Sequence, residues 1–368
     1  MIIDITGLPP ERIVFEPSPL AELGVALHAL AEPGHHPALH GWATATAAAL
    51  KPDLADRLHE ANFLWITTFS DIFMPYAGIR GGDGRTGGTL AEELDVLDRL
   101  DEDLFMAAAL EFTCSERYAT GGSVSEARAL ELAANRGPRQ LDFTRRLLAD
   151  PAGVRAWLRR LFEDCDEAFF ADTWRRTAPG LAADARHKTE LLRHKGLSET
   201  LRAVSPAVSL EVSADGTRRC VAVDKLANGR TTAFEPGAAP GVTFIPTSFG
   251  RPHLSVLHAQ GWRPVVHYPV GGAELPGAAS VELLQLRMDA LAHPMRMRLC
   301  RNLARAAYTT GELADTYGIT PPEVSRHLAV LKKAGLVSTR RRGRYVLHQL
   351  DVAAVARIGS DFLETVLR

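Results

Sequence analysis

The chain has 368 residues, of which 46% are apolar, and a formal net charge of −2. This length predicts two or three domains, each with enough apolar residues for a core. The scattered cysteines exclude a disulfide framework or a zinc knuckle, and no signal peptide or apolar stretch of 18 residues occurs, so we expect a soluble cytoplasmic protein with no membrane partner (Cys114, Cys165, Cys220, Cys300).

The small net charge conceals a split along the chain. Residues 282–350 hold twelve basic and five acidic residues, a net charge of +7, which leaves −9 for the rest. A basic segment beside an acidic one suits a polyanionic partner for the basic segment alone.

Residues 1–205 are predicted to form a helical body with few strands. Apolar residues recur at helical spacing in five stretches, 20–30, 40–50, 89–110, 124–134 and 151–174. Asp150 before Pro151 is typical of a helix start. The segment 78–88 has six glycines in eleven residues and predicts a mobile loop, but it lacks the Gly-Lys-Ser/Thr ending of a phosphate-binding loop.

Residues 206–270 change to an alternating pattern and are predicted as a small β-rich part of the same region. We expect a hairpin from 208–212 and 218–223 around Asp215-Gly216, followed by short strands at 242–247, 254–258 and 264–269. Residues 271–279 are predicted to be a linker. The predicted fold class is therefore α+β, a helical body with a short antiparallel sheet.

Residues 280–368 predict a separate domain. One helix ends at His293-Pro294 and an amphipathic helix follows from Met295 to Ala304. Thr309 and Glu312 have capping-box spacing, and Gly318 suits the end of that short helix. Thr320-Pro321-Pro322-Glu323 predicts a second capping box, which gives a helix-turn-helix.

The second helix of this motif is predicted to be amphipathic. Val324, Leu328 and Leu331 share one face, so the opposite face presents hydroxyl, guanidinium and ammonium groups. These groups contact phosphates and base edges in a major groove. The residues predicted to bind DNA in and before this helix are Thr320, Pro322, Ser325, Arg326, His327, Lys332 and Lys333.

Two alternating segments, 336–342 and 345–350, predict a hairpin with an arginine-rich tip. Such a hairpin beside a recognition helix is a wing that contacts the DNA backbone or minor groove. The predicted wing contacts are Arg340, Arg341, Arg342 and Arg344, and Asp351 is predicted to cap a last helix, 352–367.

Together these motifs resemble the ArsR family of bacterial winged-helix repressors. The resemblance rests on Leu291-Ala292-His293-Pro294-Met295-Arg296, Gly311-Glu312-Leu313-Ala314, Val324-Ser325-Arg326-His327-Leu328, Leu331, Ala334-Gly335-Leu336-Val337 and Arg342-Gly343-Arg344. It implies a repressor that binds a double-stranded DNA operator as a homodimer, through the first and last helices of the domain. It also implies groove contacts from Ser325, Arg326 and His327.

The body resembles more loosely a long N-terminal region found in some ArsR-type regulators of high-GC bacteria. Ser18-Pro19-Leu20, Trp262-Arg263-Pro264 and Tyr268-Pro269 support this likeness. It implies little chemistry.

The metal sites usual in the ArsR family lack their ligands here. Residues 308–313 contain no cysteine and the last helix contains no histidine, whereas soft metals need thiolates. Histidines elsewhere are interpreted as ordinary surface or core residues, so we expect neither a metal site nor a cofactor (His35, His36, His40, His187, His194, His253, His258, His267).

Any regulatory signal is therefore expected to be received by the body and not by the DNA-binding domain. A small-molecule effector in an apolar pocket is one hypothesis, with lining residues Phe169, Trp174, Phe244, Trp262 and Tyr268, although core packing explains them more simply. A dimerisation or protein-interaction module is the second hypothesis. An enzyme domain is the third, but the sequence has no nucleophile elbow, zinc-protease, dinucleotide or deaminase motif, so we expect no catalytic residues.

Overall fold

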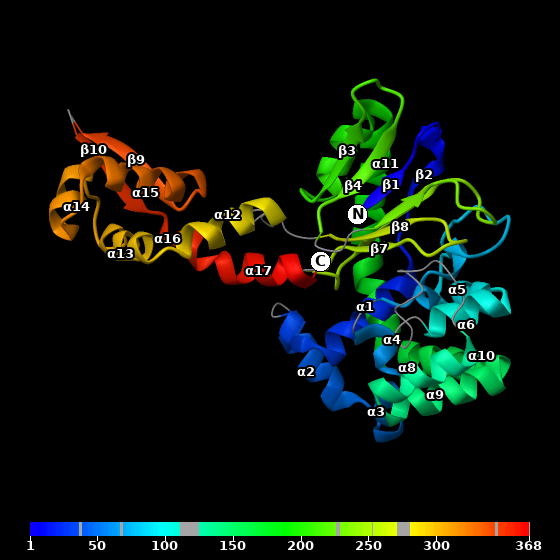
Figure 1. Ribbon diagram of the computed structural model, residues 1–368. Coiled ribbons are helices and arrows are strands. Elements are labelled where there is room, and N and C mark those ends of the chain that lie inside the picture. The colour runs from blue at the N-terminus through cyan, green and yellow to red at the C-terminus, as the bar shows by residue number, and fades with distance from the viewer. Residues whose placement is uncertain are drawn as a thin grey trace. The chain divides into compact units, whose positions relative to one another are not determined.

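The computed structural model describes residues 1–36, 39–66, 69–110, 125–225, 229–251, 253–270, 280–342 and 345–367. The chain divides into two compact units (Figure 1). Residues 1–223 and 229–270 form the body, and residues 280–366 with Asp224 and Lys225 form the module. The predicted linker, 271–279, lies outside the described residues.

The strands of the body form two four-stranded sheets, with the orders β3-β4-β1-β5 and β2-β6-β8-β7. Five predicted strands are confirmed to within one residue, as β3, β4, β6, β7 and β8. The bounds are β1 (Ile2–Asp4), β2 (Ile13–Phe15), β3 (Val208–Val212), β4 (Arg219–Val223), β5 (Arg230–Thr232), β6 (Val242–Thr247), β7 (Ser255–Leu257) and β8 (Val265–Pro269).

Both sheets differ from the predicted short antiparallel sheet because each takes one strand from the first fifteen residues. β1 pairs with β4 antiparallel and with β5 parallel, and β2 pairs with β6 parallel. The sheets are therefore mixed, and they join both ends of the body. Strands of three residues are too short to show a period of two, which is why the sequence did not reveal β1 and β2.

The helices of the body follow the predicted periodic stretches. α1 begins at Ser18, whose hydroxyl accepts a hydrogen bond from the Ala21 amide at 3.1 Å, and it is enclosed on almost every side. The bounds are α1 (Pro19–Ala31), α2 (His40–Ala49), α3 (Pro52–Ala61), α4 (Phe63–Ile66), α5 (Leu90–Asp98), α6 (Glu102–Leu110), α8 (Glu126–Arg136), α9 (Pro138–Ala149), α10 (Pro151–Cys165) and α11 (Ala171–Val204). Short 3-10 turns cover Pro10–Arg12, Pro33–His35, Asp71–Phe73 and Pro75–Ala77.

Two predicted helical stretches are interrupted. The stretch 89–110 breaks between α5 and α6, where the Asp101 carboxylate accepts a hydrogen bond from the Asp103 amide at 3.2 Å. The stretch 151–174 passes through a π-helical turn, Asp166–Phe170, between α10 and α11. The start at Asp150 is confirmed, since its side chain caps the Gly153 amide at 2.9 Å.

The glycine-rich segment 78–88 contains neither helix nor strand, as predicted, but it is anchored rather than open. The Arg263 guanidinium donates to the Asp83 carbonyl at 2.7 Å, and the Thr243 hydroxyl donates to the Gly84 carbonyl at 3.3 Å. Gly84 has φ +71°, and a Cβ there would lie 2.5 Å from the Arg263 side chain. A glycine is therefore required where this loop crosses the buried arginine.

The module contains six helices and a hairpin in the described residues (Figure 1). Its core joins α13, α14, α15 and the start of β9 through leucines and Val324. The predicted last helix, 352–367, is two helices. The bounds are α12 (Val281–Leu291), α13 (Pro294–Leu303), α14 (Thr310–Tyr317), α15 (Pro321–Lys333), β9 (Val337–Arg342), β10 (Tyr345–Leu350), α16 (Val352–Ala356) and α17 (Ile358–Leu367).

Candidate nucleic-acid interface

The helix-turn-helix of the module is formed by α14 and α15. α14 begins with the predicted capping box, in which Thr309 and Glu312 bond each other's backbone amides. Gly318 ends α14 in the left-handed conformation, with φ 63°. Leu313 and Ala314 of α14 are buried in the core that also contains Val324 of α15. The two helices are thus fixed against each other by local signals and one shared core.

α15 begins as predicted but is capped differently. Thr320 is the N-cap residue and Pro321 occupies the first turn, yet the Thr320 side chain makes no capping hydrogen bond. The predicted second capping box is therefore wrong. Pro321 and Pro322 have no amide hydrogens, so fewer donors at this helix start need a partner.

The two faces of α15 have opposite chemistry. Val324 and Leu331 are fully buried and Leu328 is 3% exposed, as predicted. The other face is exposed to solvent, and among the described residues none of its cationic side chains has an ion-pair partner (Thr320, Pro322, Ser325, Arg326, Lys332, Lys333). An exposed row of hydroxyl and cationic groups on a helix suits the phosphates and base edges of a major groove.

His327 differs from the other predicted contacts on α15. It is partly buried, and its ring lies 4.9 Å from that of His293, the N-cap residue of α13. Burial and the positive groups nearby, His293 foremost, lower its pKa below the ordinary value. The ring is therefore a neutral group at the edge of the exposed face.

The wing is the antiparallel hairpin β9–β10, which lies beside α15 (Figure 1). Arg340 pairs with Leu347 and Arg341 pairs with Val346 in the register of the hairpin. Both arginine side chains are exposed. The Arg342 side chain and the whole of Arg344 lie outside the described residues, so their predicted contacts stay predictions.

A buried acidic side chain makes two ion pairs in the described part of the module. Asp361 of α17 is 2% exposed and accepts from Arg287 of α12 at 2.6 Å and from Arg357 at 3.4 Å. This buried group joins the first and last helices of the module. The described cationic side chains of α15 and of the wing, in contrast, are exposed to solvent.

The aromatic residues predicted to line a pocket in the body are divided between two apolar clusters. Trp262 is fully buried in one apolar cluster, with Phe169 and Trp174 packed against it, whereas Phe244 and Tyr268 are buried in another. The Tyr268 hydroxyl donates to Asp184 at 2.6 Å. Trp174 borders a cavity of about 630 Å³ along α11.

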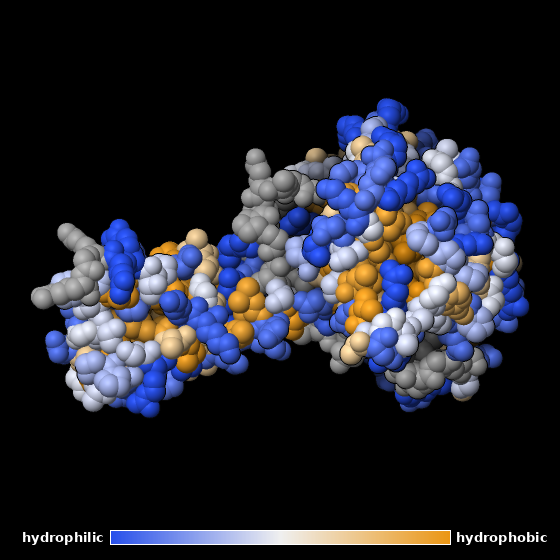
Figure 2. All heavy atoms as spheres, turned by 90° about the horizontal axis from the view of Figure 1, so that it is seen from above, coloured by the Kyte–Doolittle hydropathy of each residue, from blue (hydrophilic) through white to orange (hydrophobic). Residues whose placement is uncertain are grey.

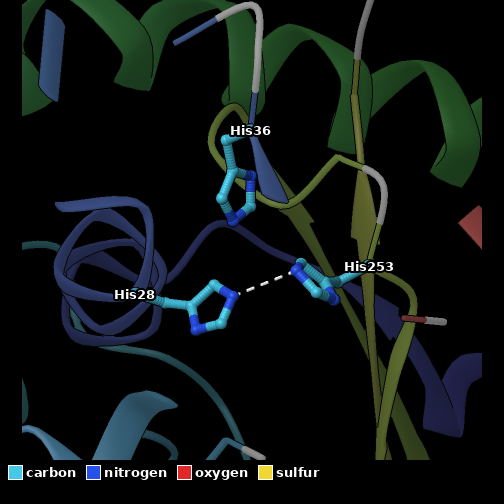
Figure 3. A group of neighbouring side chains, drawn as sticks. All are labelled: His28, His36 and His253. Carbon is cyan, nitrogen blue, oxygen red and sulfur yellow. Dashed lines mark hydrogen bonds between the residues drawn. The ribbon is translucent and has the colours of Figure 1, made fainter. Parts of the chain in front are cut away.

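Three histidines of the body lie close together, a grouping that the interpretation as ordinary surface or core residues does not include. His28, His36 and His253 each place one ring nitrogen within 4.8 Å of the others (Figure 3). Nothing in the sequence draws attention to His28, because it stands alone in an apolar helix, 225 residues before His253 in the chain.

No helix among the described residues has the length and apolar character needed to span a membrane.

Comparison with known proteins agrees with this geometry. Residues 291–340 match a family model described as a helix-turn-helix domain. A biofilm growth-associated repressor of Agrobacterium fabrum is 37% identical over 71 residues, 19% of this chain and 61% of that protein. The transcriptional repressor SmtB of Mycobacterium tuberculosis is 39% identical over 83 residues, 23% of this chain and 58% of that protein.

A solved structure, the repressor BigR of Xylella fastidiosa, is 29% identical, with a TM-score of 0.19, and covers 22% of this chain and 82% of its own. The chain spans about three fifths of the length of the curated relatives named above. The motifs and these matches together define the module as a winged helix-turn-helix domain similar to that of the repressors named above. Residues 1–274 match the model of a family of unknown function, DUF5937, and the chain belongs to that family.

Proposed function

We propose that the chain binds double-stranded operator DNA as a homodimer and represses transcription. The observation that supports this most is the two-faced helix α15, whose apolar side is buried while Ser325, Arg326, Lys332 and Lys333 are exposed. In this proposal α15 enters the major groove and Arg340 and Arg341 contact the adjacent backbone or minor groove. The similar repressors named above support the sign of regulation.

Exposed apolar side chains support the homodimer. They lie on the first and last helices of the module, through which the family resemblance implies that two copies pack. Apolar side chains are exposed on α12 and α17, and hydrophobic atoms reach the surface of the module in Figure 2 (Met288, Phe362, Leu363, Val366). Two copies would cover such side chains and place two α15 helices on successive half-sites. Light scattering after size exclusion of the full chain tests this, and a monomer at every concentration would contradict it.

Arg326 provides the sharpest test of DNA binding. We expect Arg326→Ala to weaken binding of the full chain to its own upstream region by about 1–3 kcal/mol if the side chain contacts a base. Fluorescence anisotropy at several salt concentrations measures this, and affinity should fall steeply as salt rises.

The matched control removes an arginine from the body. Arg193 is exposed on α11, and Arg193→Ala changes the net charge of the chain equally. We expect wild-type affinity from this variant. Equal loss in both variants, or unchanged affinity in Arg326→Ala, would refute the assignment of α15 as the reading helix.

The role of the body is proposed as signal reception. A small-molecule effector is one candidate, and a protein partner or dimerisation role is the other; the body is not proposed as an enzyme. Stabilisation of the full chain against heat by a saturating metabolite would favour the first.

A further inference from the structure

Three histidines meet inside the body although they come from distant parts of the chain. His28 lies in the last turn of α1, His36 follows the 3-10 turn Pro33–His35, and His253 precedes β7. His28 is 8% exposed and His36 is 2% exposed. Figure 3 shows the three rings turned toward a common centre, with a hydrogen bond of 3.0 Å between the Nε2 atoms of His28 and His253.

The hydrogen bonds of two of these rings fix which nitrogen is a lone-pair donor. The Nδ1 atom of His28 lies 2.6 Å from the Trp65 carbonyl, and that of His36 lies 2.7 Å from the Arg251 carbonyl. A carbonyl oxygen only accepts, so each Nδ1 must hold the proton and each Nε2 must hold a lone pair. An imidazole held through its other nitrogen by a backbone carbonyl is the arrangement that metal-ligating histidines adopt.

The metal-free arrangement leaves one of these lone pairs unsatisfied. His253 can donate its Nε2 hydrogen to His28, but the Nε2 atom of His36 is buried without a hydrogen-bond partner. A buried polar atom without a partner costs about 1–3 kcal/mol. A cation at the centre would satisfy both lone pairs and remove that cost.

The chemistry of the ligands indicates which cation fits. The group consists of imidazoles alone among the described residues, with no carboxylate or thiolate in it. Imidazole nitrogen suits zinc and the neighbouring divalent transition metals, whereas calcium and magnesium require oxygen. Burial lowers the pKa of His28 and of His36 to about 4, so both rings are neutral at pH 7 and can ligate.

One of the distances is close to that of a tetrahedral zinc site. Zinc–nitrogen bonds of about 2.0–2.1 Å place two ligand nitrogens about 3.3 Å apart. The His28 and His253 nitrogens are 3.0 Å apart, and all three ligand atoms lie within 4.8 Å of one another. Small rotations of the rings would equalise these separations.

We propose that His28, His36 and His253 bind one Zn²⁺ ion through their Nε2 atoms, in the body and apart from the winged-helix module. His35 is the candidate for the fourth ligand. Its ring centre lies 5.6 Å from that of His28 and 5.8 Å from that of His253, and its Nδ1 atom is buried without a partner. The site would tie α1 and the turn after it to the segment before β7.

The test uses the full chain without an affinity tag, freed of metal with a chelator. Calorimetric titration with Zn²⁺ should give one ion per chain, and Co²⁺ should give the visible bands of a four-coordinate site. We expect His36→Ala and His253→Ala each to lower the zinc affinity at least about 100-fold. Zinc should also raise the unfolding temperature of the wild type and not that of the variants.

Control variants separate the site from incidental histidines. His187 and His194 are exposed on α11, so His187→Ala and His194→Ala should bind zinc as the wild type does. His253 is the least buried of the three, and circular dichroism of metal-free His253→Ala shows whether the body stays folded. No zinc bound by the wild type, or unchanged affinity in a folded His253→Ala, would overturn the proposal, and neither result depends on DNA binding.

Discussion

The body and the module treat charge in opposite ways. In the described residues the body buries ionisable side chains within its core, Glu22, Glu93, Lys188, Arg263 and His267 among them. The module exposes its cations on α15 and the wing, and its buried Asp361 has two arginine partners. The exposed cations of the module suit an external polyanion. The body instead buries ionisable groups, which costs free energy of folding unless hydrogen bonds or ion pairs offset it.

Removal of the buried cation Arg263 from the body should change the free energy of unfolding most. Arg263 is 2% exposed, and its guanidinium donates to the carbonyls of Asp83 and Arg12 at 2.7 and 2.9 Å. Burial lowers its pKa to about 10, so it remains charged at pH 7. We expect Arg263→Ala to lower the free energy of unfolding by about 3–5 kcal/mol, because both carbonyls lose their donor and a cavity forms.

Urea denaturation of the full chain measures this loss, and hydrogen exchange should show faster opening of segment 78–88. Arg12→Ala is the matched control, since that side chain is exposed while only its carbonyl is used. Its expected cost is within about 0.5 kcal/mol. If the two variants lost similar amounts of unfolding free energy, the claim that the buried arginine stabilises the body more than the exposed one would be contradicted.

The buried carboxyl groups of the body should make its stability depend on pH. Burial raises the pKa of Glu93 to about 8 and that of Glu22 to about 7. The folded state therefore retains protons that the unfolded chain releases near its ordinary pKa, so this stability is complete below that value and is lost as pH rises through 7 and 8. These two carboxyl groups should together lower the free energy of unfolding by about 2 kcal/mol between pH 6.5 and 8.

Glu93→Gln tests this assignment by removing the titrating group. Whatever its effect on total stability, the variant should flatten the decline between pH 6.5 and 8, and Glu22→Gln should remove a smaller part of it. The window begins at the ordinary pKa of histidine, so the buried neutral histidines add a smaller rise in stability with pH, which is common to the wild type and both variants. A decline of wild-type steepness in Glu93→Gln would show that another group is responsible.

The smallest effect concerns two helix starts in the module. The Thr309 hydroxyl accepts from the Glu312 amide at 3.2 Å, whereas the Thr320 side chain caps nothing. We expect Thr309→Ala to cost about 1 kcal/mol of unfolding free energy and Thr320→Ala only a few tenths. Thermal unfolding of both variants decides, and an equal cost would mean that capping does not distinguish α14 from α15.

Most of the module can be predicted from its sequence, because the signals that specify it are local. Thr309 with Glu312, Gly318, and the spacing of Val324, Leu328 and Leu331 each act within a few residues and specify the helices, their ends and the exposed face of α15. The second capping box is wrong because the Thr320 side chain caps nothing, and the Glu323 amide that it would cap donates to the Thr320 backbone carbonyl at 2.9 Å instead.

The interior of the body, in contrast, depends on contacts between segments that are distant in the chain. β1 and β2 find partners more than 200 residues away, and three-residue strands have no pattern of their own. The predicted aromatic residues lie in two separate cores, while His28 lies beside His253, which is 225 residues later in the chain. Such contacts depend on which distant segments pack together, and side-chain periodicity indicates which face is buried but not what it is buried against.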